Sequence, residues 1–237
     1  MRLLEAESGS CIIAVTNTAD SPLAAAAEAT VLTRAGEEAS VSCKTYVTAL
    51  VALAWLGSVL EGADAGTASE PLLNVGRAVG EYLANWRAHV TDLGGDLDGV
   101  SDIFLVGRGT SLAAAGTGGL IVKESTGVHA EGMSSAAFRH GPMEMTSDSV
   151  FVLVFEGTAP TLDLNRRLAA DVAAAGGRCA LVAHEADRPA LRLPQLSPEL
   201  SPVTEILPVE MLTLALAARE GREAGGFTIG RKVTTSE

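Results

Sequence analysis

Aromatic residues are scarce in this chain, and cysteines are few. Phe, Trp and Tyr make up 4% of the 237 residues, which excludes a core built on aromatic cross-strand pairs. Abundant alanine and glycine instead favour helices packed closely on a sheet. The three cysteines, Cys11, Cys43 and Cys179, are widely separated and show neither CxxC nor Cys/His spacing. They indicate neither a disulfide framework nor a zinc site, so we expect a reducing, cytoplasmic location, no metal and no cofactor.

Positive charge is also in short supply. Lys and Arg number 17 against 29 Asp and Glu, which gives a net charge of −12. This charge repels nucleic acid and anionic membrane surfaces, so neither is an expected partner. No apolar run reaches about 18 residues, and the first residues, MRLLEAESGS, lack the regions of a signal peptide. We therefore expect a soluble protein that is not exported.

Hydrophobic residues, 47% of the chain, follow alternating strand and helix patterns. Residues 11–17 and 29–33 are typical of short buried strands, and the helix between them begins with Ser21 as N-cap and Pro22. A glycine- and aspartate-rich stretch at 93–102 then separates two parts of the chain. Further helices are predicted at 46–60, 70–90, from 110 or 111 onward, 162–176 and 206–220, and further strands at 103–106, 150–155 and 179–184. This order predicts an α/β protein with αβα layers and parallel sheets, comprising an incomplete unit at 1–92 and a complete domain at 93–237.

Gly107-Arg108-Gly109-Thr110-Ser111 lies where a predicted strand gives way to a helix. Free backbone N–H groups and two hydroxyls would face one point there, an arrangement suited to a phosphate. The alternative is a tight turn in which glycine only permits close packing. The stretch lacks the third glycine of a dinucleotide fingerprint and the GK[ST] of a P-loop, which excludes both nucleotide motifs.

Two residues after this turn can carry proton chemistry. Glu124 follows an apolar helix face, so its carboxylate can be partly desolvated and become a better base; the alternative is a solvated glutamate paired with a nearby lysine. His140 lies in Arg-His-Gly-Pro, and because glycine and proline break helices we predict a turn. Its ring can move a proton near neutral pH; the alternative is a ring hydrogen-bonded to a loop carbonyl.

A family resemblance emerges from several motifs taken in order. The run GRGTSLAAAGTGGLIVKESTGVHAEGMSSAAFRHGP is similar to the second half of the sugar isomerase (SIS) double-domain family, of the type that forms the isomerase part of glucosamine-6-phosphate synthase. Upstream, TN, S-x-L and AGxE followed by S-x-K resemble the closing half of the first SIS domain. Downstream, LPVEMLTLALAAREG and RKVTT resemble the last helix and tail. The resemblance covers essentially the whole chain and implies flavodoxin-like SIS domains, the first one lacking its first half and its phosphate-holding loop.

The resemblance also implies roles for particular residues. Glu124 matches the general base that moves a proton between C1 and C2 of the open sugar. His140 matches the histidine that helps to open the ring and reaches the site from the neighbouring subunit, which implies a homodimer. Substrate contacts are implied for Val41 and Ser42, and for Arg231 or Lys232 as the residue that closes over the sugar.

The implied function is aldose–ketose isomerisation of a hexose or amino-sugar 6-phosphate, with or without transfer or release of the amine. Ile121 replaces the lysine that synthases carry three residues before the base, which favours a plain isomerase or a deaminase. Two alternatives stay open: a non-catalytic SIS module that senses a sugar phosphate, and an inactive truncated fragment. A sensor does not need both Glu124 and His140, so their presence favours the enzyme lineage.

Overall fold

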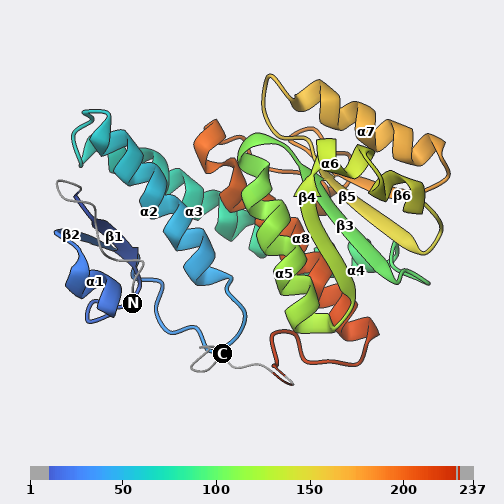
Figure 1. The fold of residues 1–237 in the computed structure, drawn as a ribbon, viewed down its shortest axis with the longest axis horizontal. Helices are drawn as coiled ribbons and strands as arrows, with labels where there is room; N and C mark the ends of the chain where they lie inside the picture. The colour runs from blue at the N-terminus through green and yellow to red at the C-terminus, as the bar shows by residue number, and fades with distance from the viewer. Residues whose placement is uncertain (1–10, 228, 230–237) are drawn as a thin grey trace. The chain divides into compact units, whose positions relative to one another are not determined.

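The structure, a computed structural model, describes residues 11–227 and 229 and divides the chain into two compact units (Figure 1). Unit 1 is Met1–Leu73 and unit 2 is Asn74–Glu237. The division falls within helix α3 (Glu70–Leu83). The predicted boundary between residues 92 and 93 lies later, ahead of the first strand of the larger sheet.

Unit 1 is built on a two-stranded parallel sheet. Strand β1 (Ile13–Thr16) pairs with β2 (Ala29–Leu32), and α1 (Pro22–Ala26) connects them. Ser21 caps α1 as predicted, because its Oγ accepts the N–H of Ala24 and Pro22 opens the helix. Helix α2 (Lys44–Leu60) and the short 3-10 helix η2 (Thr67–Ser69) follow.

Unit 2 contains a four-stranded sheet in the order β4-β3-β5-β6, and every neighbouring pair is parallel. After β3 the chain forms β4 on one side of it. The chain then crosses to the other side of β3, where it forms β5 and, beyond that, β6. The carboxyl ends of β3 and β5 therefore flank the switch point where α/β folds commonly bind ligands. The strands are β3 (Asp102–Gly107), β4 (His129–Ser134), β5 (Val150–Phe155) and β6 (Arg178–Val182).

Helices cover both faces of this sheet, which confirms the α/β class with three αβα layers (Figure 1). Helices α5 and α8 pack together on one face with α4 against α8, while α6 and α7 lie on the other face. The helices are α4 (Trp86–Gly94), α5 (Leu112–Thr126), α6 (Ser135–Arg139), α7 (Leu162–Ala174) and α8 (Ser201–Arg219), with 3-10 helices η3 (Gly109–Ser111), η4 (Pro142–Met145), η5 (Pro189–Leu191) and η6 (Pro198–Leu200).

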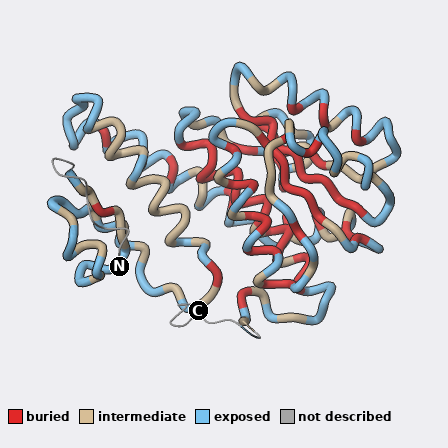
Figure 2. Tube along the Cα trace, in the orientation of Figure 1, coloured by how far each residue is buried: buried red, intermediate tan, exposed pale blue. Residues whose placement is uncertain are grey.

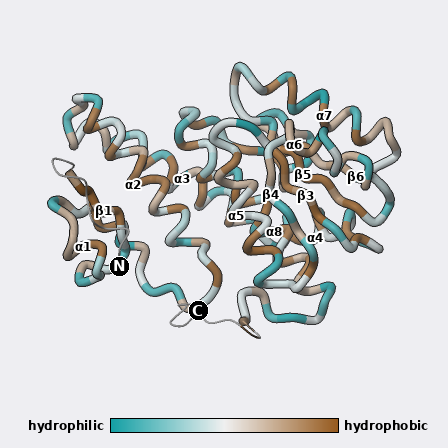
Figure 3. Tube along the Cα trace, in the orientation of Figure 1, coloured by the Kyte–Doolittle hydropathy of each residue, from teal (hydrophilic) through white to brown (hydrophobic). Residues whose placement is uncertain are grey.

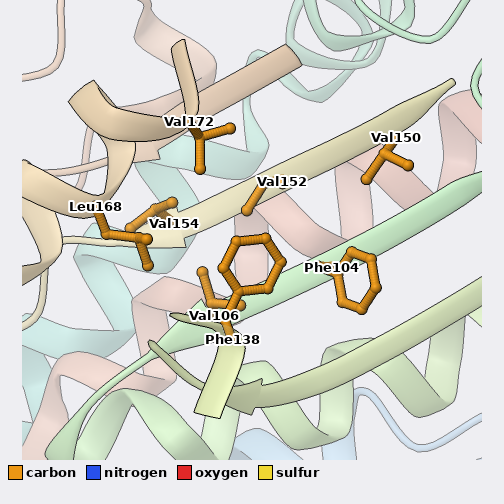
Figure 4. Close-up of a cluster of buried hydrophobic side chains, with 8 residues drawn as sticks. All are labelled: Phe104, Val106, Phe138, Val150, Val152, Val154, Leu168 and Val172. Atoms are coloured by element: carbon orange, nitrogen blue, oxygen red, sulfur yellow. The ribbon is translucent and has the colours of Figure 1, made fainter. Parts of the chain in front are cut away.

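Burial and hydrophobicity in unit 2 coincide along the central strands and α8 (Figures 2 and 3). The stretch Pro198–Arg219 is long and apolar enough to cross a membrane, yet most of its residues are buried, and it serves here as the core helix of unit 2. On the other face, side chains from β3, β5, α6 and α7 form one cluster (Figure 4): Phe104, Val106, Phe138, Val150, Val152, Val154, Leu168 and Val172.

Several elements differ from the sequence-based expectation, among them α6, which was not predicted. Strand β4 was not predicted, because its sequence HAEGMS contains glycine and polar residues and is only partly buried at the sheet edge. The single helix expected at 70–90 is two helices, α3 and α4, interrupted at residues 84 and 85. Helix α8 begins at Ser201 rather than at 206, because Pro202 lies in the first turn, where a proline costs no hydrogen bond.

Candidate active site

The helix that carries Glu124 lies very close to strand β4. A Cβ on Gly132 of β4 would overlap the carbonyl oxygen of Ala115, and a Cβ on Gly119 would lie 2.6 Å from the amide nitrogen of Gly132. Only glycine permits this approach of helix to strand. The two glycines therefore fix how α5 is seated on the sheet, and with it the position of Glu124.

Glu124 is half-buried in the last turn of α5. The turn is well closed: Thr126 Oγ1 donates to the carbonyl of Val122 at 2.7 Å, and Gly127, in the left-handed conformation, donates its N–H to the carbonyl of Lys123. Among the described residues Glu124 makes no ion pair, with Lys123 or any other cation. The predicted alternative, a glutamate paired with a neighbouring lysine, is not what the structure shows.

An apolar stripe runs along the outer side of α5 and ends at this carboxylate. Leu112 is 44% exposed and Leu120 is 50% exposed, with exposed Gly116 midway between them. Glu124 continues the same spacing of four residues, which places it on one helix face with them. Any chain or ligand that covers this stripe would remove water from Glu124 and make it a stronger base.

His140 ends α6 and is exposed. Its backbone N–H donates to the carbonyl of Ala137 at 3.0 Å, Gly141 follows with φ 140°, and Pro142 begins η4. The turn predicted from Arg-His-Gly-Pro is confirmed. Within the described part of the chain, the His140 ring has no hydrogen-bond partner, so the alternative of a ring held by a loop carbonyl is not observed.

One copy of the chain does not bring Glu124 and His140 together. Helix α5 runs antiparallel to β4, so Glu124 lies near the beginning of β4, whereas His140 follows its end through α6. The six residues of β4 extend over about 17 Å at roughly 3.3 Å per residue. The topology therefore places the two residues toward opposite ends of β4 in a single copy.

The other residues predicted to contact the substrate are not among the described residues of unit 2. Val41 is buried and Ser42 is exposed, in the segment that leads into α2 of unit 1. Arg231 and Lys232 lie outside the described residues.

Two motif residues of unit 1 shape the segment around Val41. Asn17, from the TN motif, holds the AG turn: its Nδ2 donates to the carbonyl of Gly36 at 2.8 Å, and its Oδ1 accepts the N–H of Ala35 at 2.7 Å. Glu38, from AGxE, caps α2 by accepting the N–H groups of Cys43 and Thr45.

Sequence reasoning missed a buried polar cluster at the carboxyl ends of β3, β4 and β5. Ser111 Oγ donates to Glu205 Oε1 at 2.7 Å, and Ser135 Oγ donates to Asn165 Oδ1 at 2.6 Å. Asn165 in turn donates to the backbone carbonyl of Glu156 at 3.0 Å. All five residues are at most 3% exposed. A signal did exist for Glu205, because it shares its helix face with Pro208, Val209 and Leu212, and an acid on an apolar face is unusual.

Burial raises the pKa of three groups of unit 2, Tyr82, Cys179 and Glu205, of which the last two bear on the chemistry of the site. It raises the pKa of Glu205 to about 7, an effect that the hydrogen bond from Ser111 partly offsets. It also raises the pKa of the Cys179 thiol to about 12. Cys179 is therefore a protonated, unreactive thiol at neutral pH.

A separate pocket of about 480 Å³, lined by both charged and apolar side chains, lies beside β6 and contains none of the predicted site residues. Glu156 and Arg166 line it and are paired with each other, Nε to Oε1, at 2.6 Å. Arg188 also lines it and is paired with Asp92 and Asp96. Because both arginines already have carboxylate partners, this pocket offers no free cation to a phosphate.

Known proteins match this chain in sequence and in fold. The profile of the SIS domain matches residues 97–219. The glutamine–fructose-6-phosphate aminotransferase (isomerizing) of Thermococcus kodakarensis is 30% identical, and the match covers 93% of this chain and 38% of that protein. This chain thus spans well under half the length of such relatives.

Two solved structures have the same fold. The C-terminal domain of glucosamine-fructose-6-phosphate aminotransferase from Francisella tularensis superposes with a TM-score of 0.78 at 23% identity, over 90% of this chain and 64% of that one. Glucosamine-6-phosphate deaminase from Thermotoga maritima superposes with a TM-score of 0.73 at 18% identity, over 91% of this chain and 64% of that one.

Proposed function

Because this chain belongs to the SIS domain family, we propose that it isomerises a hexose or amino-sugar 6-phosphate between its aldose and ketose forms. The observation that carries the proposal is the state of Glu124. It is a half-buried carboxylate without an ion pair among the described residues, held on a helix that glycines seat firmly on the sheet. Such a group is suited to accept and return a proton.

In the proposed reaction Glu124 is the general base. With the sugar in its open form, the carboxylate removes a proton from C1 of the ketose, the C–H electron pair forms the C1–C2 double bond, and the former carbonyl oxygen O2 takes up a proton from solvent to give an enediol. Glu124 then returns its proton to C2 while O1 loses its proton to solvent and the C1 carbonyl of the aldose forms. The reverse sequence gives the ketose. His140 moves the proton that ring opening requires at the ring oxygen.

The same proposal assigns the substrate contacts. Val41 and Ser42 would contact the sugar phosphate. Either Arg231 or Lys232 would close over it and contribute a positive charge.

The separation of Glu124 from His140 supports a homodimer. Since the length of β4, about 17 Å, lies between them in one copy, a site that uses both residues would take each from a different copy. The exposed apolar stripe on α5 is consistent with such assembly, because Leu112 and Leu120 would gain from being covered.

Ile121 bears on whether nitrogen takes part. It lies one turn before Glu124 and is 1% exposed, so an apolar side chain fills that position in the core. No amine stands there to assist amine transfer. We therefore favour a plain isomerase or an ammonia-releasing deaminase over a glutamine-dependent synthase.

A product assay on the natural polypeptide tests this proposal. The substrates are glucose 6-phosphate, glucosamine 6-phosphate, and fructose 6-phosphate with and without ammonia. We expect interconversion of the hexose phosphates or release of ammonia from glucosamine 6-phosphate, and loss of either activity in Glu124→Gln. Tight binding of a sugar phosphate with no turnover would contradict the proposal and favour a sensor.

A further inference from the structure

Helices α5 and α8 end at the same side of unit 2, and one arginine joins their ends (Figure 1). At their beginnings, Ser111 before α5 is bonded to Glu205 near the start of α8, so the two helices run in the same direction. At their ends, Arg222 Nη1 donates to the backbone carbonyl of Thr126 at 2.9 Å. This bond joins residues 96 positions apart and falls on the helical turn that carries Glu124.

Arg222 is held in place by the way in which α8 ends. Its backbone N–H donates to the carbonyl of Ala217 at 2.8 Å, and the N–H of Gly221 donates to the carbonyl of Ala218 at 3.2 Å. Gly221 has φ 64°, so these two bonds form the Schellman motif with which helices commonly end. The backbone of Arg222 is therefore fixed to α8, while its half-buried side chain reaches across to α5.

Gly127 makes room for the guanidinium of Arg222. A Cβ on Gly127 would overlap Arg222 Nη1, so any side chain at position 127 would displace the arginine. Gly127 also has φ 73°, a conformation that residues other than glycine rarely adopt. Glycine at this position thus permits both the left-handed end of α5 and the contact with Arg222.

The bond from Arg222 strengthens a part of α5 that would otherwise open easily. The last carbonyls of a helix have no partner within it, and helix ends open at little cost. In α5 the carbonyl of Lys123 accepts the N–H of Gly127, and the hydroxyl of Thr126 accepts the N–H of Val128 at 3.0 Å. Both of these bonds arise within the turn itself. Arg222 adds a charge-assisted bond from the end of another helix, which is of the stronger kind.

We infer that Arg222 is a positioning residue for the isomerisation proposed above, on which this inference rests. It acts through the carbonyl of Thr126: by keeping the last turn of α5 closed, it holds the carboxylate of Glu124 where the carboxylate meets C1 and C2 of the sugar. A general base has to lie within hydrogen-bonding distance of the proton that it moves, so a turn that opens costs rate. Since Arg222 acts through the backbone, its loss should lower kcat and leave KM nearly unchanged.

The first measurement needs no substrate and is therefore independent of the proposed reaction. Amide hydrogen exchange of the natural polypeptide is compared with that of Arg222→Gln. We expect the amides of Gly127 and Val128, which close the last turn, to exchange about 10-fold faster or more in the variant, and the middle of α5 to exchange as in wild type. Unchanged exchange at both amides would overturn the inference, whatever the activity of the protein.

Steady-state kinetics then test the role in catalysis, with the sugar phosphate that the product assay identifies. Arg222→Gln should lower kcat by about 10-fold and leave KM within about 2-fold. Arg222→Lys keeps a charged donor and should restore kcat to within about 3-fold of wild type. The matched control is Arg219→Gln, because Arg219 also lies at the end of α8 and donates to a backbone carbonyl, that of Leu97. Its kcat should stay within about 2-fold of wild type.

A further arm uses the room that Gly127 leaves. Because a methyl group there would displace the guanidinium, Arg222→Gln should change kcat by less than about 2-fold in a Gly127→Ala background. A higher KM at unchanged kcat in Arg222→Gln would mean that the arginine contacts the substrate, and would overturn the positioning role, as would an equal loss of kcat in Arg219→Gln. A wild-type protein without turnover would overturn the proposed reaction and this catalytic role with it, even where exchange shows that Arg222 closes the turn.

Discussion

Glu124 and Glu205 are two carboxylates of one unit that differ in burial and in hydrogen bonding. Glu124 is half-buried at a helix end, where water and a substrate can both reach it. Glu205 is almost wholly buried and hydrogen-bonded to Ser111, and its pKa is raised to about 7. The role proposed for the first is to exchange protons with a ligand, whereas burial keeps the second largely protonated below about pH 7.

The raised pKa of Glu205 predicts how stability depends on pH. The folded value, about 7, exceeds the ordinary value of 4.5, so the folded state holds the proton more tightly than the unfolded state does. Its contribution is complete below pH 4.5 and is lost as the pH rises through about 7, with a total change on the order of 3 kcal/mol in the free energy of unfolding. Urea denaturation at about pH 5 and pH 8.5 measures this loss, which Glu205→Gln should abolish. An equal loss in that variant would show that another group is responsible.

At the scale of elements, the contact between α5 and β4 decides where Glu124 lies. Gly119 and Gly132 let the helix backbone approach the strand so closely that a methyl group cannot fit between them. Composition alone predicts only that the small residues of α5 allow close packing. The structure shows that Gly119 in particular permits the contact with β4.

This contact predicts opposite effects for two similar substitutions. Gly132→Ala places a methyl group against the carbonyl of Ala115 and should lower the free energy of unfolding by about 1–3 kcal/mol or more. Gly116→Ala, on the exposed side of α5 with nothing within 4 Å of its Cβ, should instead raise it by about 0.5–1 kcal/mol. Urea denaturation of both variants measures the difference. Equal stability of the two would mean that the glycines do not set the helix position.

The elements also show what the sequence could predict. Strand β5 has the predicted bounds, because VFVLVF is a continuous apolar run buried on both faces. Strand β4 was missed because an edge strand needs fewer apolar residues and its register comes from pairing with β3. Glu124 and His140 were proposed from local motifs, whereas the bond from Ser111 to Glu205 joins residues 94 positions apart and depends on tertiary packing.

For the whole molecule, the main consequence is that one copy does not complete the proposed active site. Strand β4 separates Glu124 from His140, so each site would combine the base of one copy with the histidine of another. The SIS fold supplies the framework for this arrangement, and the apolar stripe on α5 supplies surface that assembly would cover.

The most direct test of this account mixes two inactive variants of the natural polypeptide. Glu124→Gln and His140→Ala should each lower isomerase turnover by about 100-fold or more. After verified subunit exchange in equal amounts, half of the dimers are mixed and each has one intact site, so the account predicts recovery of about a quarter of wild-type activity. Turnover that stays at the average of the two separate variants would contradict a site shared between copies, and full turnover in Glu124→Gln alone would contradict the base itself.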